Sequence, residues 1–133
     1  MRALLEQGEC ILATDYLNAQ RARRRFVAEL EALFRKVAVL VTPTTPVTAA
    51  AIGETTVRVN GDTEDVRLAS TRLVRAWNLA GAPVLSVPCG FDHRGLPIGM
   101  QIVGKPFDEA TVLRVGYAYQ QATDWTHRHP PEP

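Results

Sequence analysis

The sequence has no hydrophobic run long enough to cross a membrane, contains only two cysteines and has a formal net charge of only +1. A membrane-spanning helix needs about 20 consecutive apolar residues, and a signal peptide would keep an apolar core where this chain has Glu6. Cys10 and Cys89 have neither a metal-binding spacing nor the number for a disulfide framework, so both are expected to be free thiols. These absences argue against a membrane protein and a disulfide-rich secreted domain, and they favour a cytoplasmic protein.

The chain also lacks the basic surplus that nucleic-acid binding needs. It has 15 basic and 14 acidic residues, and the arginines of the single basic cluster, residues 21–25, are not interleaved with aromatic residues. A protein that neutralises phosphates carries a clear positive excess. No nucleic-acid partner is therefore expected, and a nucleic-acid-binding helix is the weakest of the alternatives.

Metal ligands are scarce as well. His127 and His129 are two residues apart in a proline-rich tail, whereas a metal ion needs three or four converging ligands. The sequence therefore predicts no metal site.

The hydrophobic pattern predicts helices and short strands. Residues 47–65 lack periodicity and are expected to form a long connection with a turn at Asn60-Gly61. The strands expected over residues 84–87 and 98–103 are joined by a short loop and are expected to pair antiparallel. The predicted elements are the end of a helix over residues 2–7, a helix from 14 or 15 to 34, a strand over 37–41, a helix from 63 or 65 to 78–81, strands over 84–87 and 98–103, and a helix opening at 106–109.

These elements indicate an α/β fold. Residues 37–41 are all apolar, which is typical of a strand covered on both faces in a parallel or mixed sheet. We expect about three strands and three to four helices in layers. A sheet of this size leaves two edges that need pairing, so the chain could form a homo-oligomer through an exposed sheet edge.

Several stretches together point to a known family. They are Leu5–Gly8, Asp15–Gln20, Val39–Thr44 with its Thr-Pro-Thr ending, Asn78–Phe91, Gly95–Gly104, Phe107–Leu113 and Ala122–Trp125. In this order and spacing they resemble the C-terminal part of the amidase-signature family, serine hydrolases that cleave carboxamides. The resemblance covers nearly the whole chain and implies that residues 1–133 are a single segment of an α/β/α layered fold with a mixed sheet.

The resemblance also implies that the catalytic residues lie elsewhere. The family uses a Ser-Ser-Lys arrangement from a Gly/Ser-rich region earlier in the chain, whereas this sequence has only Ser70 and Ser86, and only Lys36 and Lys105. No residue here is expected to be catalytic, and the chain is expected to be inactive alone. The intact enzyme would act on a small-molecule carboxamide and would need no cofactor.

By the same resemblance, the Thr-Pro-Thr turn and the end of the following helix lie near the substrate cavity. The candidate substrate-binding residues are Thr42, Thr44, Thr45 and Asn78. A turn that satisfies its own backbone and a helix cap explain these residues equally well. Gln101 and Arg24 are expected to have structural roles.

Two remaining polar residues have plainer interpretations. Ser86 lies among apolar residues without a glycine elbow, so we expect a core hydroxyl bonded to backbone rather than a nucleophile. Cys89 is expected to be a small buried residue.

One departure from the family separates two functions. The glutamine amidotransferase A-type subunits tend to carry an aspartate where this chain has Thr71. The sequence therefore favours a general amidase over a protein of that type. A third interpretation is a free-standing binding or dimerisation module derived from an amidase.

Overall fold

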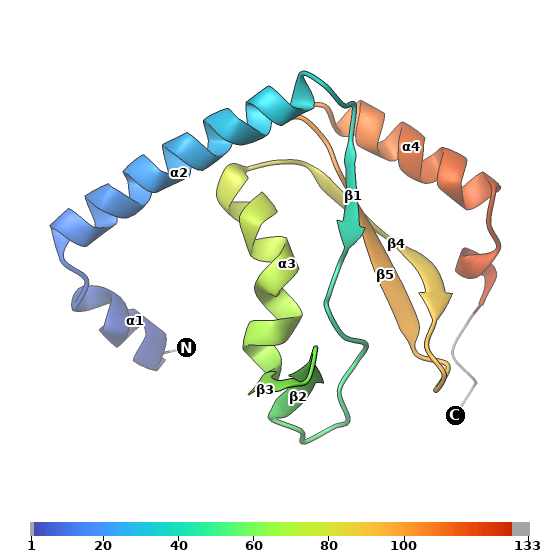
Figure 1. Ribbon diagram of the computed structural model, residues 1–133, viewed down its shortest axis with the longest axis horizontal. Coiled ribbons are helices and arrows are strands. Elements are labelled where there is room, and N and C mark those ends of the chain that lie inside the picture. Colours follow the sequence, from blue (N-terminus) through green and yellow to red (C-terminus); the bar gives the residue numbers. More distant parts are fainter. Residues whose placement is uncertain (1, 129–133) are drawn as a thin grey trace.

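The computed structural model describes residues 2–128, so His129 lies outside the described residues. Within the described residues, two helices are followed by three strands, one helix, two strands and two further helices (Figure 1). The helices are α1 (Arg2–Glu9), α2 (Ala13–Phe34), α3 (Val66–Ala80), α4 (Glu109–Gln121) and the short 3₁₀ helix η1 (Trp125–His127), and the strands are β1 (Leu40–Pro43), β2 (Thr56–Val59), β3 (Asp62–Asp65), β4 (Val84–Phe91) and β5 (Pro97–Val103).

The main sheet has three strands in the order β1-β5-β4, and the central β5 runs antiparallel to both neighbours. The α/β class and the antiparallel pairing of the last two strands are confirmed. The expected mixed pairing is not seen within residues 2–128, because β1 and β4 run parallel to each other but are separated by β5.

The two faces of the sheet pack against different helices. Side chains alternate between faces along a strand, so Val103 and its neighbour Ile102 point to opposite sides. One face packs on α2 and α3, and the other packs on α4 (Figure 1). The first cluster is built from Leu30, Phe34 and Val103, and the second from Val87, Ile102 and Val112. The result is the expected three-layer arrangement.

The two strands that contain a proline end differently. Strand β1 ends at Pro43, which pairs with Met100, close to the predicted end of this strand. The strand predicted over residues 84–87 instead continues through Pro88, which pairs with Gly99, to Phe91, with an irregularity between Pro88 and Gly90. The predicted end of β4 was wrong because β4 is an edge of this sheet, where proline and bulges are tolerated.

The first strand also begins later than predicted, at Leu40. Residues 37–41 are not covered on both faces, since Val37 is 38% exposed and Val41 is 55% exposed. Part of this apolar run is therefore exposed to solvent in the structure.

The long connection contains structure that its composition did not reveal. Strands β2 and β3 form a hairpin around Asn60 and Gly61, whose positive φ angles of 52° and 98° suit a tight hairpin turn. The second strand reads Asp-Thr-Glu-Asp and has no apolar alternation, which is why only the turn was predicted.

The limits of α3 follow from local chemistry. The Asp65 carboxylate accepts hydrogen bonds from the backbone N–H groups of Arg67 and Leu68, at 2.9 and 3.2 Å. Gly81 ends the helix in the left-handed conformation, with φ 73°. Both ends agree with the prediction, and they fix where the following strand begins.

Large apolar side chains remain exposed at the N-terminal end of the fold. Helix α1 and the first half of α2 extend beyond the sheet (Figure 1). Leu5, Ile11, Leu12, Tyr16 and Leu17 are each more than half exposed. The homo-oligomer expected from an open sheet edge stays a prediction. Among the described helices, none has both the length and the apolar character for a membrane crossing.

Candidate functional site

A row of polar residues crosses the sheet on the face that packs against α3. Thr42 in β1 and Ser86 in β4 both stand opposite Gln101 in the central strand. Residues paired across neighbouring strands share a face, so these three side chains lie on the same side as the apolar Val103. The hydrophobic layer under α2 therefore gives way to a polar layer under α3.

Gln101 joins the sheet to that helix. Its side chain is 1% exposed, and its Nε2 donates to the backbone carbonyls of Pro43 and Leu73, at 2.9 and 3.2 Å. Its Oε1 has no hydrogen-bond partner among the described residues. These contacts agree with the structural role expected for Gln101, and that role remains a prediction.

Two hydroxyl groups meet beside this glutamine. Thr44 Oγ1 and Ser86 Oγ are 2.8 Å apart and share a hydrogen bond. Gly99 lies beneath them, and a Cβ at that position would come within 2.9 Å of Thr44 Oγ1. The expectation for Ser86 was wrong, since the residue is exposed and bonds to a side chain rather than to backbone. The close approach of β1 and β4 over a glycine explains the difference.

These groups line a cavity of about 150 Å³ between α3 and the sheet. Two of the four predicted substrate-binding residues, Thr44 and Asn78, come together there. The lining residues are Thr44, Val74, Trp77, Asn78, Val84, Ser86 and Gln101. Neither Val74 nor Trp77 nor Val84 was singled out by the sequence, because apolar residues at helical or strand spacing give no signal of a cavity wall.

The other two predicted residues lie outside the lining. Thr45 donates a hydrogen bond from Oγ1 to the carbonyl of Val47, at 2.7 Å, as a turn residue does. Thr42 Oγ1 is buried without a hydrogen-bond partner in the part of the chain that the structure describes. Their role in substrate binding stays a prediction.

A different arginine from the expected one links α2 to α3. Arg23 Nε donates to the carbonyl of Leu79, at 2.6 Å, in the last turn of α3. A cation is favourable there because the last carbonyls of a helix lack intrahelical donors. Arg24 is exposed on α2, and its structural role stays a prediction. The signal for Arg23 was its place near the apolar face of the helix.

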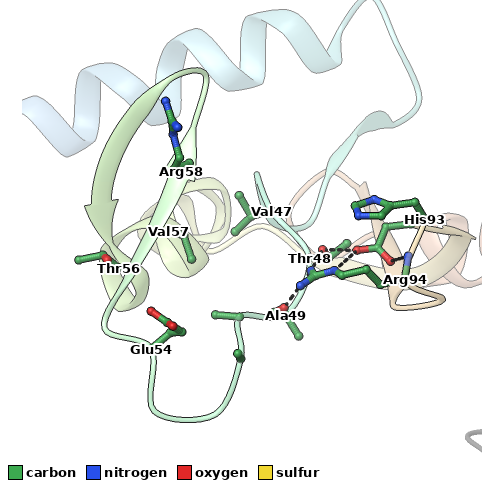
Figure 2. Close-up of a pocket in the computed structure, with 12 residues that line it drawn as sticks. Val47, Thr48, Ala49, Glu54, Thr56, Val57, Arg58, His93 and Arg94 are labelled. Carbon is green, nitrogen blue, oxygen red and sulfur yellow. Dashed lines mark hydrogen bonds and ion pairs between the residues drawn. The ribbon is translucent and has the colours of Figure 1, made fainter.

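A second, wider hollow of about 560 Å³ lies between the loop after β1 and the turn that joins β4 to β5 (Figure 2). Thr48 and Arg94 meet at its wall, where Arg94 Nη2 donates to Thr48 Oγ1 at 2.9 Å and Thr48 Oγ1 donates to Asp92 Oδ2 at 2.7 Å. The backbone N–H groups of Arg94 and Leu96 donate to Asp92 Oδ1. Asp92 thus fastens the loop to the hairpin.

These donors act on the acidity of Asp92. The Thr48 hydroxyl, and then the backbone N–H groups of Leu96 and Arg94, hold the pKa of Asp92 well below its ordinary value. The contribution of this carboxylate to folding is therefore complete above its unfolded pKa of about 3.9 and is lost as the pH falls through the lower folded pKa.

We expect Asp92→Asn to weaken the acid sensitivity of folding, because asparagine does not titrate. Urea midpoints at pH about 6 and about 3 measure the effect, and the wild-type midpoint should fall more between them than that of the variant. Thr48→Val, which removes the main hydrogen bond, should change the profile in the same direction. An Asp92→Asn profile parallel to the wild type would contradict this role.

Neither hollow contains an activated nucleophile among the described residues. The hydrogen-bond partner of Ser86 is a threonine hydroxyl, which is no general base. No group of histidine, cysteine or acidic side chains within residues 2–128 could hold a metal ion. Cys10 and Cys89 are free, as predicted.

Comparisons with known proteins place this geometry in context. A family model described as Amidase matches residues 1–113. An amidase from Pseudomonas putida is 41% identical over 131 residues, which are 98% of this chain and 28% of that protein. The A-type subunit of a glutamyl-tRNA(Gln) amidotransferase from Cyanothece sp. (strain PCC 7425 / ATCC 29141) is 47% identical over 115 residues, 86% of this chain and 23% of that protein.

Solved structures agree in fold. The crystal structure of an amidase superposes with a TM-score of 0.86 at 28% identity, over 92% of this chain and 28% of that one. The chain spans about a quarter of the length of these relatives, 28% and 23% for the two sequences.

Proposed function

Because this chain belongs to the amidase family, whose model matches residues 1–113, we propose that it forms the C-terminal part of an enzyme that hydrolyses small carboxamides. The family match over most of the chain carries the proposal and agrees with the resemblance read from the sequence. Residues 1–133 would form one segment that supplies a wall of the substrate site. A cytoplasmic location and the absence of a metal or organic cofactor are part of the same proposal.

The division of labour follows from what the cavity contains. A serine and a lysine outside this segment would supply the nucleophile and its base, and the acyl-enzyme would be hydrolysed by water after the amine leaves. Thr44, Ser86 and Asn78 would contact the acyl part of the substrate. All three are uncharged hydrogen-bonding side chains, which suits a neutral amide.

A second function is favoured by one observation. The identity of 47% to the Cyanothece amidotransferase protein exceeds the 41% to the Pseudomonas putida amidase, although over a shorter stretch. In that case the intact protein would release ammonia from glutamine for a partner protein. Thr71, where the amidotransferase proteins tend to carry an aspartate, favours the general amidase.

The test is to express the intact reading frame that contains this segment and to measure ammonia release from simple aliphatic amides and from glutamine. We expect release by the intact protein from simple amides without a partner protein, and none from residues 1–133 alone. Release only from glutamine would favour the amidotransferase function. An intact protein inert on every amide would leave the binding or dimerisation module as the better explanation.

A further inference from the structure

The 150 Å³ cavity between α3 and the sheet is lined without a single charged side chain. Its polar groups are hydroxyls and amides, and its apolar walls come from Val74, Trp77 and Val84. A charged group that moves from water into such surroundings loses hydration without gaining a counter-charge. On the side that this chain supplies, the lining therefore disfavours carboxylate and ammonium groups.

Two of the lining residues keep a buried hydrogen-bonding atom without a partner among the described residues. Trp77 Nε1 is a donor and Gln101 Oε1 is an acceptor. An indole nitrogen can only donate, and the amide nitrogen of Gln101 is already used by two backbone carbonyls. Buried polar groups in folded proteins are nearly always satisfied, so an unpaired donor and acceptor beside a cavity indicate a ligand that supplies the complement.

The size of the cavity limits that ligand. A cavity of about 150 Å³ accepts one benzene molecule in a well-packed protein, which is about six non-hydrogen atoms. A branched apolar group of this size would fit by volume but would leave both polar atoms unpaired. A neutral amide of this size would fit and would offer an N–H donor to Gln101 and a carbonyl acceptor to Trp77.

We propose that this cavity selects a substrate whose acyl chain ends in a second neutral group that both donates and accepts hydrogen bonds, such as a carboxamide, and that Trp77 is a specificity-determining residue. The inference rests on the proposed amide hydrolysis. The Thr44–Ser86 hydroxyl pair, held at 2.8 Å over Gly99, extends the same uncharged hydrogen-bonding surface at the cavity wall. The acyl chain would enter with its polar end toward Gln101.

Three probes of matched shape separate the possibilities: succinamide, succinamate and isocaproamide. Their acyl chains share length and branching, and they end in a neutral amide, a carboxylate and a dimethyl group. With the intact protein we expect kcat/KM for succinamide to exceed that for isocaproamide by at least about tenfold, the value of one good buried hydrogen bond. Trp77→Phe should remove most of this preference, because it should lower kcat/KM for succinamide by a clearly larger factor than kcat/KM for isocaproamide.

Trp125→Phe is the matched control, because Trp125 packs near Phe91 at the end of β4 and does not line the cavity. Binding is read separately from the indole N–H resonance that disappears in Trp77→Phe. This resonance should shift with succinamide and not with succinamate, whether or not any amide is cleaved.

The outcomes separate the two proposals. Equal use of the three probes, or an equal loss on all of them in Trp77→Phe, would overturn the specificity while leaving amide hydrolysis standing. A protein that cleaves none of them but shows the indole shift would overturn the hydrolysis and retain the binding site. An indole resonance unmoved by succinamide would overturn the inference.

Discussion

Phe34→Ala is expected to lower the free energy of unfolding by about 3–5 kcal/mol, the usual cost of removing a buried aromatic ring. Phe34 is 2% exposed at the last turn of α2 and packs with Leu30 and Val103 in the cluster between the helix and the sheet. The substitution leaves a cavity at the point where α2 is held to the central strand. Since the first half of α2 extends beyond the sheet, the helix is held mainly by this cluster and by the hydrogen bond from Arg23 to Leu79 in α3.

Leu33→Ala is the matched control, because Leu33 precedes Phe34 on the same helix and is 41% exposed. Its loss should be clearly smaller. Urea unfolding at one fixed protein concentration, followed by circular dichroism, measures both variants. Equal losses in the two variants would mean that the end of α2 does not pack on the sheet as described.

Helix limits could be predicted from the sequence because their signals are local. Asp65 caps α3 through N–H groups two and three residues ahead, and Gly81 adopts the left-handed conformation that other residues avoid. Such interactions depend on a few neighbours along the chain and survive any change in the rest of the fold.

Strand limits were less predictable because they depend on where a strand lies in the sheet. Pro88 would stop a central strand but does not stop β4, which is an edge strand, and nothing within the sequence says which strands are edges. Val41 gives a second example. The apolar run around it predicted a strand covered on both faces, but this side chain is exposed, because the sequence does not show which elements cover the strand.

The candidate site was predicted only in part, because its contacts join distant positions. Thr44 and Ser86 are 42 residues apart, and Gln101 is 58 residues from Pro43 and 28 from Leu73. The family resemblance marked Thr44 and Asn78, which do line the cavity. The sequence predicted that β4 and β5 pair antiparallel but not which of their residues stand opposite each other. It therefore could not reveal that Ser86 lies on the same face of the sheet as Gln101.

Gln101→Met is expected to lower the free energy of unfolding by about 2–3 kcal/mol. Methionine has similar length but no donor, so the carbonyls of Pro43 and Leu73 lose the part-buried hydrogen bonds that connect β1 to α3. Each lost bond that leaves a buried group unpaired costs about 1–3 kcal/mol, and removal of the unpaired Oε1 offsets part of the loss.

Gln120→Met provides the same change at an exposed position of α4 and should stay within about 0.5 kcal/mol of the wild type. Denaturant unfolding of both variants measures the difference. A Gln101→Met protein as stable as its control would show that the polar row does not hold α3 to the sheet. If the loss is found, β1 and α3 are coupled through one side chain. The cavity that they enclose then depends on the same two hydrogen bonds, which makes Gln101 both a structural link and a wall of the proposed substrate site.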